Sequence, residues 1–218
     1  MLSALIAVSG IGLLLLLSEY LWRKDIIAGE YGRKAVHIAM GVYIASWPFF
    51  ISLRSIQLIA VAALLVLIVS RKFKVFHAIH DIKRTTAGEL LYPVGIFITA
   101  VLAHTNWIFS VAVLFVALAD GMAAVIGKKY GSKRLTYHVF GAKKTLIGSV
   151  GYIIFAYAAL GVGFFIGGKQ TMQSSPTAIF VWLPVFCTLL ESVSVYGTDN
   201  ITAPLAVVLV LNMLLLRS

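Results

Sequence analysis

The residues between 120 and 149 are of types that could bind a phosphate group. Asp120 follows an apolar run, residues 107–119, so its carboxylate lies near the end of a membrane-type helix, where an ionisable group is costly without a task. At helical spacing, Ala124, Gly127 and Gly131 fall near one face and keep it free of bulk. The basic and small polar residues that follow include Lys128, Lys129, Lys133, Arg134, Lys143, Lys144, Thr145, Gly148 and Ser149. This combination suits a phosphate with its metal, and the alternative is a basic cytoplasmic loop between two membrane helices.

The loop before the second apolar segment is also basic. Arg33, Lys34 and His37 are at helical spacing, so all three can point one way and could hold an anion. The alternative is that Arg33 and Lys34 only set the orientation of the helix in the membrane and that His37 lies at the membrane interface without binding an anion.

Three further carboxylates stand at the ends of apolar segments. Glu89 begins one segment, and acids in such places tend to face an interior or a water-filled cavity. Glu191 ends another, and Asp199 precedes the last, where it could either bind a metal or cap a helix. With Asp120 these residues make four candidate carboxylates among basic side chains. Hard oxygen ligands beside lysine and arginine are what a magnesium nucleotide requires.

Composition decides which kind of protein must position these residues. The chain has 218 residues, 61% of them hydrophobic, and a mean hydropathy of +0.98, which is too apolar for a water-soluble domain. The net charge of +10 therefore indicates cytoplasmic loops and contact with anionic lipids rather than nucleic acid binding. The single cysteine, Cys187, is most simply a packing residue.

Apolar segments fill nearly the whole chain. A helix needs about 20 apolar residues to span the hydrocarbon layer, and eight segments approach this length: 2–22, 35–53, 55–70, 90–104, 107–127, 147–167, 177–193 and 201–216. Some are short, so seven spans are also possible. The prediction is one all-α polytopic membrane domain over residues 1–218, whose first helix is retained and not cleaved as a signal peptide.

The charges predict an orientation. If all eight segments cross, the loops on one side carry 15 of the 18 lysines and arginines, and the other side keeps Arg54, Lys169 and Arg217. All eight acids also lie at or near the basic side. The basic side is then cytoplasmic and both termini are outside. The orientation of a membrane protein depends on its lysines and arginines and does not require acidic residues on the same side. The acids on the basic side therefore indicate a functional site there.

The loop from residue 71 to 93 has a second feature. Val75, Phe76, Ile79 and Ile82 have helical periodicity, which predicts a short amphipathic helix in the headgroup layer, beside which a lipid could enter.

Phosphoryl or nucleotidyl transfer needs charge neutralisation and alignment, which a metal, basic side chains and backbone amides can supply. No G-x-x-x-x-G-K-[ST] motif occurs, and no strand is predicted that could carry one, so any nucleotide must be held differently.

Six motifs in order resemble a known family. They are R-K-x-x-H at Arg33, R-x-x-x-G-E-x-x-Y-P at Arg84, D-G-x-A-x-x-x-G-x-x-x-G at Asp120, K-K-T-x-x-G-S at Lys143, Glu191, and D-N-x-x-x-P at Asp199. Together, over most of the chain, they resemble the CTP-dependent lipid kinases, which include dolichol kinase, phytol kinase and yeast-type diacylglycerol kinase and are related to phosphatidate cytidylyltransferase. The resemblance implies CTP as phosphoryl donor, a divalent metal (Mg²⁺), and an isoprenoid or glycerolipid alcohol as acceptor, such as a polyprenol, dolichol, phytol or diacylglycerol.

Within this resemblance each candidate residue receives a role. Glu89, Asp120 and Lys144 are the catalytic candidates, with Glu89 on the acceptor hydroxyl, and Asp120, Glu191 and Asp199 are the metal candidates. The nucleotide candidates are Arg33, Lys34, His37, Gly127, Gly131, Lys143, Lys144, Thr145, Gly148 and Ser149.

Other readings compete with the kinase. A phosphatidate cytidylyltransferase would use the same nucleotide to make a CDP-lipid, and a small anion transporter would use the basic face as a vestibule. CDP-alcohol phosphotransferases are disfavoured, because Val125 stands where their D-G-x-x-A-R signature has arginine, and prenyltransferases lack support because paired aspartate-rich motifs are absent.

Overall fold

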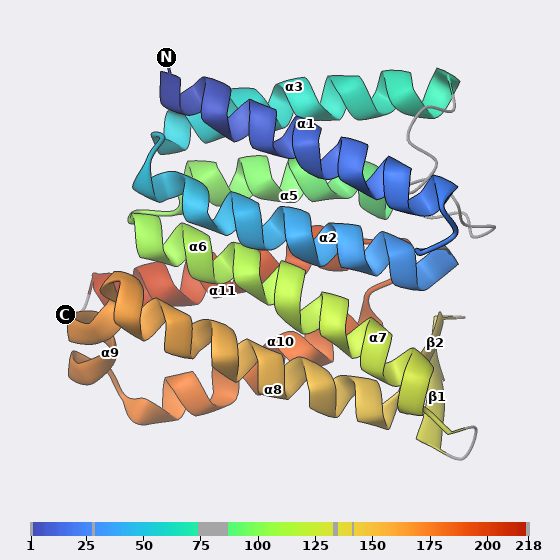
Figure 1. The fold of residues 1–218 in the computed structure, drawn as a ribbon. Helices are drawn as coiled ribbons and strands as arrows, with labels where there is room; N and C mark the ends of the chain where they lie inside the picture. Colours follow the sequence, from blue (N-terminus) through green and yellow to red (C-terminus); the bar gives the residue numbers. More distant parts are fainter. Residues whose placement is uncertain (1, 28, 74–86, 133–134, 141, 217–218) are drawn as a thin grey trace.

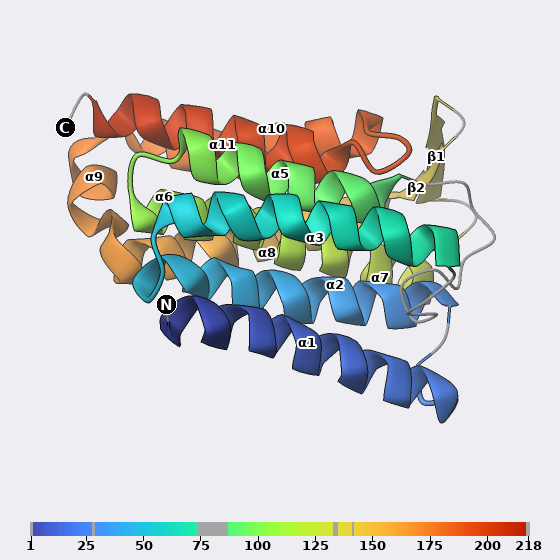
Figure 2. The same cartoon turned by 90° about the horizontal axis from the view of Figure 1, so that it is seen from above.

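The fold is a bundle of helices that lie side by side along a common direction (Figures 1 and 2). The structure, a computed structural model, describes all residues except 1, 28, 74–86, 133–134, 141 and 217–218. The α-helices are α1 (Leu2–Arg23), α2 (Gly29–Ser46), α3 (Leu53–Phe73), α5 (Gly88–Leu102), α6 (Asn106–Leu114), α7 (Gly121–Tyr130), α8 (Leu146–Gly163), α9 (Lys169–Ser174), α10 (Thr177–Val193) and α11 (Asp199–Leu215). The all-α prediction is confirmed, and each of the eight predicted segments falls on a helix.

The centre of the bundle is one long helix. α6 and α7 continue into each other through a π-helical turn, Phe115–Asp120, and together they span Asn106–Tyr130. All nine residues of α6 are buried except its first, and the helix is apolar on every side, as expected for a helix surrounded by others. Asp120 ends the π turn, so the sequence places one carboxylate on the most buried helix of the protein.

Four helices are long and apolar enough to cross a bilayer. They are Leu2–Arg23, Leu53–Phe73, Asn106–Tyr130 and Leu146–Ser174, the last of which joins α8 to α9 through a second π turn, Phe164–Gly168. α5, α10 and α11 are apolar but shorter. α2 begins with Glu30, Arg33 and Lys34 in its first turns and packs against α1 and α6. Of the predicted spans, the structure thus supports four by length and composition.

A small β-hairpin interrupts the helical pattern, contrary to the expectation that the chain has no strand. β1 (Thr136–Val139) pairs antiparallel with β2 (Ala142–Thr145), in a register that sets Tyr137 opposite Lys144. Phe140, directly after β1, has a positive φ of 47°, a backbone conformation typical of tight hairpin turns. The hairpin delivers Lys143 and Lys144 to the start of α8.

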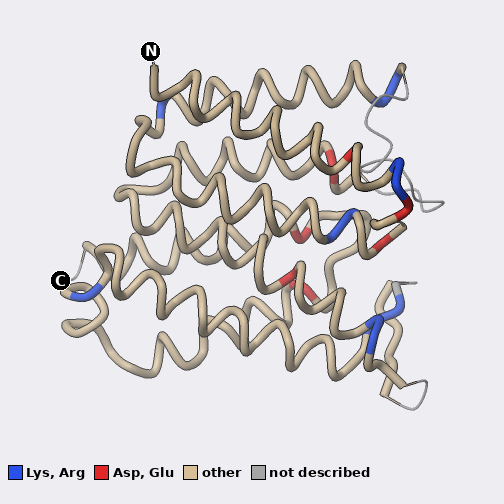
Figure 3. Tube along the Cα trace, viewed as in Figure 1, with Lys and Arg blue, Asp and Glu red and all other residues tan. Residues whose placement is uncertain are grey.

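Charged residues gather at one end of the bundle (Figure 3). The described acids all lie in this half, together with most of the described lysines and arginines, whereas Arg54 and Lys169 belong to the opposite end. The connections α1–α2, α7–β1 and α10–α11 reach the charged end. The predicted amphipathic helix at 75–82, and the bases Lys133 and Arg134, lie outside the described residues.

Candidate functional site

A cavity of about 1510 Å³ lies at the charged end of the bundle. Helices α1, α2, α3, α5, α7, α8, α10 and α11 and the hairpin all contribute to its wall. Every residue that the sequence put forward for the site lines it: Arg33, Lys34, His37, Glu89, Asp120, Gly127, Gly131, Lys143, Lys144, Thr145, Gly148, Ser149, Glu191 and Asp199. The structure therefore brings together side chains from helices and strands that are far apart in the sequence, although it does not test the role of each residue.

A buried ion pair joins α2 to the central helix. Lys34 Nζ donates to Asp120 Oδ2 at 2.5 Å, and both side chains are only 8% exposed. Because removing charges from water is expensive, such a pair is retained only with close geometry and further partners. His37 lies beside the pair, with its Nε2 3.7 Å from Asp120 Oδ2.

His37 also fixes the π turn. Its Nε2 is 3.0 Å from the carbonyl oxygen of Val116, and because a carbonyl can only accept, the ring donates through Nε2. The ring packs against that of Tyr92 from α5, with centroids 4.6 Å apart. The hydroxyl of Tyr92 is buried at the cavity wall without a hydrogen-bond partner among the described residues. π-Helical turns often mark functional sites, and here the turn sets Asp120 beside Lys34 and His37.

A second ion pair joins the hairpin to α10. Lys144 Nζ donates to a carboxylate oxygen of Glu191 and, at 2.9 Å, to the backbone oxygen of the same residue. Burial lowers the pKa of Lys144, but the nearby carboxylates of Glu191, Asp199 and Asp120 raise it by more, so that the pKa ends above its ordinary value. Lys144 is therefore a charged ammonium at neutral pH.

The start of α8 completes this wall. The Thr145 side chain caps the helix by accepting from the Gly148 backbone N–H at 3.1 Å. Gly127 of α7 lies against Gly148, and a β-carbon on Gly127 would stand 2.6 Å from Thr145 Oγ1. The glycines thus allow α7 and α8 to approach closely, as their spacing predicted. A helix N-terminus with free amides and positive potential is suited to phosphate.

Tyr137, which the sequence reasoning missed, contacts Ser149 of the cavity wall. Its hydroxyl lies 2.8 Å from both Ser149 Oγ and Ser192 Oγ, so β1, α8 and α10 meet at one hydrogen-bonded point. The only local signal was the hairpin pattern, in which the strand-favouring residues 136–139 precede a residue–glycine pair.

The remaining carboxylates differ in their partners. Glu89 Oε1 lies 3.6 Å from Arg71 Nε of α3, and Arg33 pairs with Glu30 at 2.5 Å. Asp199 accepts from the Asn200 backbone N–H at 3.2 Å and makes no salt bridge with any described residue. The Asn200 Oδ1 beside it is buried without a partner in the described part of the chain.

Magnesium was predicted from the carboxylates. Within the described ranges, no group of three or more histidine, cysteine, aspartate or glutamate side chains is close enough to hold a metal by itself. Of the three metal candidates, Asp120 and Glu191 each bind an ammonium, and Asp199 makes no salt bridge with a described cation. Hard oxygens of this kind fit magnesium only if other ligands, such as phosphate oxygens, complete the set.

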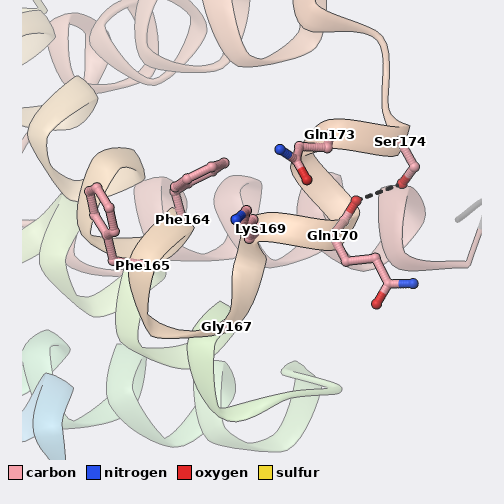
Figure 4. Close-up of a pocket in the computed structure, with 7 residues that line it drawn as sticks. All are labelled: Phe164, Phe165, Gly167, Lys169, Gln170, Gln173 and Ser174. Atoms are coloured by element: carbon pink, nitrogen blue, oxygen red, sulfur yellow. Dashed lines mark hydrogen bonds between the residues drawn. The ribbon is translucent and has the colours of Figure 1, made fainter.

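A second cavity, of about 720 Å³, lies at the opposite end, between the second π turn and α9 (Figure 4). Phe164 and Phe165 flank it, and Ser174 Oγ donates to the Gln170 carbonyl at 2.9 Å. Its lining contains one cation, Lys169, and no carboxylate, so it lacks the chemistry of the charged end.

Seven proteins are similar to this chain, and all are named phytol kinases or probable phytol kinases. The phytol kinase of Synechocystis sp. is 26% identical over 209 residues, which cover 94% of this chain and 88% of the relative. Phytol kinase 1, chloroplastic, of Arabidopsis thaliana is 26% identical over 233 residues, which cover 94% and 74%. Probable phytol kinase 2, chloroplastic, of Oryza sativa is 27% identical, with 93% and 72% covered. No family model and no solved structure matches. These relatives confirm the resemblance to lipid kinases, while the relation to cytidylyltransferases stays a prediction.

Proposed function

We propose that this protein is a membrane kinase that transfers the γ-phosphoryl group of CTP to the hydroxyl of a lipid alcohol. The observation that carries the proposal is the similarity to phytol kinases over 94% of the chain. The kinase activity follows from these relatives, whereas CTP as donor rests on the six motifs.

The reaction needs little covalent work from the protein. The alcohol oxygen forms a bond to the γ-phosphorus, the bond from that phosphorus to the β,γ-bridging oxygen breaks, and CDP leaves with the electron pair. The hydroxyl proton passes to a base. The protein must align the two oxygens and balance the phosphate charge.

The cavity offers cations for this task on two sides. Lys34 and Arg33 approach from α2, and Lys143 and Lys144 approach from the hairpin beside the α8 N-terminus. We assign the triphosphate to the space between them. On binding, Lys34 and Lys144 would share their protons between Asp120 or Glu191 and the phosphate oxygens, which charge-assisted hydrogen bonds favour.

Magnesium would be held by Asp199 and Asp120 together with the nucleotide's own phosphate oxygens, and it would supply charge neutralisation. Glu89 of α5 lines the same cavity, and we assign it to the acceptor hydroxyl, which it orients and from which it accepts the proton.

We further propose that all eight helices cross the bilayer, with the charged end cytoplasmic. α2, α5, α10 and α11 run alongside the four long helices, which supports the same orientation for all of them (Figure 1). The concentration of basic residues at one end supports the cytoplasmic side. CTP would then reach the site from the cytoplasm.

Labelled CTP tests the reaction. The purified protein in detergent is given magnesium, phytol and CTP labelled at the γ- or the α-phosphate. Label from the γ-phosphate should appear on the lipid. Transfer of α-label to phosphatidate would instead identify a cytidylyltransferase, and solute flux without nucleotide would identify a transporter; the names of the relatives favour neither.

A further inference from the structure

The cavity does not end at the charged residues. Beyond Lys34 and His37 it continues between helices as a space lined mostly by hydrocarbon, here named the apolar groove. Its lining residues are Val8, Ile11, Gly12 and Leu15 of α1; Met40, Ile44 and Trp47 of α2 and the turn after it; Ile59, Ala60, Ala63 and Leu67 of α3; and Ile96 of α5. Polar and apolar parts belong to one continuous cavity.

The groove can open to the bilayer between two helices. α1 packs on α2 and α3 packs on α5, whereas α1 and α3 make at most slight contact with each other. They are also the least buried of the four long helices, with 11% and 17% of their apolar windows buried. A lipid could therefore enter sideways between α1 and α3 without crossing the charged end.

The far end of the groove is closed. Trp47 is only 1% exposed, and its ring packs edge-on against that of Tyr43, whose hydroxyl donates to the Ile6 carbonyl of α1 at 2.9 Å. This contact links α1 to α2 at the level where the groove stops. Small residues, Gly12, Ala60 and Ala63, leave the space open before that point.

The length of the groove can be compared with a hydrocarbon chain. Lys34 and Trp47 are 13 positions apart on α2 and its continuation, and His37 and Trp47 are 10 apart, so at about 1.5 Å per residue the groove is roughly 15–20 Å long. An extended carbon chain advances about 1.25 Å per bond, from a C–C length of about 1.5 Å and a near-tetrahedral angle. The groove therefore accommodates about 12–16 bonds. With four main-chain carbons in each isoprene unit, this is three to four units.

We propose that the apolar groove binds the hydrocarbon chain of the acceptor alcohol, that it holds three to four isoprene units, and that Trp47 is its end wall. This rests on the proposed lipid alcohol kinase function, because the groove leads the chain's hydroxyl end to Glu89 and Asp120. Longer polyprenols would have to leave through the opening between α1 and α3, so units beyond the fourth add no binding.

Gly12 offers a test that does not disturb packing. A β-carbon on Gly12 meets no atom within 4 Å, and the residue lines the groove, so Gly12→Leu fills space without displacing a neighbour. Gly161 of α8 has the same open surroundings but does not line the cavity, so Gly161→Leu is the matched control. Both full-length variants are assayed with CTP and alcohols of one, two, three, four and eleven isoprene units.

In the unchanged protein kcat/KM should rise with chain length up to three or four units and then level off. Gly12→Leu should lower the ratio of kcat/KM for the four-unit alcohol to that for the one-unit alcohol at least tenfold, while Gly161→Leu keeps the ratio within twofold. Trp47→Ala should move the plateau to longer chains. An unchanged ratio in Gly12→Leu, a plateau well beyond four units, or diacylglycerol as the better acceptor would overturn the proposal.

A binding measurement separates this inference from the kinase function. A four-unit alcohol with a diazirine on its last unit is photolysed with the protein without nucleotide, and labelled peptides are identified by mass spectrometry. Labels should fall near Ile44, Trp47 and Ile59 and be competed by phytol. Labels at these residues in a protein without kinase activity would support chain binding in the groove and contradict the proposed kinase function. Kinase activity with labels elsewhere would support the kinase function and contradict chain binding in the groove.

Discussion

At the scale of single residues, the buried pair of Lys34 and Asp120 is the feature on which structure and activity both depend. The two residues are 86 positions apart and nearly inaccessible, so each is the main compensation for the other's charge. Loss of one partner leaves an uncompensated charge in the interior, which typically costs about 3–5 kcal/mol. A single substitution at either position would therefore not separate an effect on folding from an effect on phosphoryl transfer.

A pair of variants separates the two effects. Asp120→Asn and Lys34→Met should each lower the melting temperature and abolish transfer from CTP. The double variant should recover most of the stability, because neither residue is then charged, but none of the activity. Melting curves by near-UV circular dichroism and the γ-label assay provide the readouts. A double variant with activity near that of the unchanged protein would contradict the assignment.

Lys144 permits a finer test. Because the pKa of Lys144 is raised above the ordinary lysine value of 10.5, its stabilising contact with Glu191 is complete below that value and is lost only as pH rises through the higher folded pKa. Lys144→Met should therefore reduce kcat/KM for CTP by a similar factor, about 10²–10³, at every pH from 7 to 9. Lys144→Arg should retain more activity than Lys144→Met, since it keeps the charge. If the loss of kcat/KM in Lys144→Met disappeared at pH 9, the positive charge of Lys144 would not be what supports the reaction.

The residue types of the site could be predicted from the sequence, but their pairing could not. The rarity of acids in an apolar chain identified Asp120, Glu89, Glu191 and Asp199 without any structure. Which lysine faces which carboxylate depends on helix rotation and packing, and these are set by contacts between segments far apart in the chain. Metal coordination was expected where the structure shows Lys34 and Lys144 bound to Asp120 and Glu191.

At the scale of elements, the contact between α5 and α11 positions two of the candidate carboxylates. Gly95 of α5 lies so close to α11 that a β-carbon there would stand 1.9 Å from the Asn200 backbone oxygen. The Asn200 side chain donates in return to the Gly88 carbonyl at 3.2 Å. The two helices thus hold Glu89 and Asp199 at a fixed separation.

Gly95→Ala should force these helices apart. Because the nearest atom is backbone and cannot rotate away, the variant should be strongly destabilised, and any folded protein should show a raised KM for both substrates. Gly161→Ala is the control, since it meets no atom within 4 Å and removes a helix-interior glycine, which should stabilise by about 0.5–1 kcal/mol. Equal melting temperatures for Gly95→Ala and the unchanged protein would show that the contact is looser than described.

The elements themselves were predictable because the apolar segments are long and uninterrupted. The hairpin was not predictable, because its strands have four residues each and lie within a basic stretch whose composition is typical of a loop. Its effect is considerable, since it turns Lys144 and Tyr137 toward α8 and α10.

At the scale of the whole molecule, the bundle concentrates its charge at one end, and this predicts its orientation. Cys187, the only cysteine, is buried, so cysteines introduced elsewhere can be labelled selectively. Cysteines replacing Lys24 or Lys129 should be shielded from a membrane-impermeant maleimide in intact cells and react after permeabilisation. Cysteines replacing Arg54 or Lys169 should react in intact cells. The reverse pattern would place the site on the outer face.

The number of membrane spans is the point on which the sequence prediction and the structure differ most. Hydropathy counts apolar residues and so treats all eight segments alike, but among the described helices four are long and apolar enough to cross a bilayer by themselves, and α5, α10 and α11 are shorter. α2, α5, α10 and α11 pack against the long helices, and this packing would let them cross the bilayer together in the arrangement proposed above.

The π turn at Phe115–Asp120 makes the site depend on a count of residues rather than on their identity. A π turn accommodates one residue more than an α-helical turn, so deleting a single residue from 115–119 would let the helix rewind regularly. Because the π turn absorbs the extra residue, rewinding keeps the relative rotation of the helix on its two sides and changes only the geometry of the turn itself. The Val116 carbonyl would then move away from His37 Nε2, even though every site residue remained in the chain. The deletion variant should keep its helical circular dichroism and lose most of its phosphoryl transfer, which makes the local geometry of this turn a part of the catalytic apparatus.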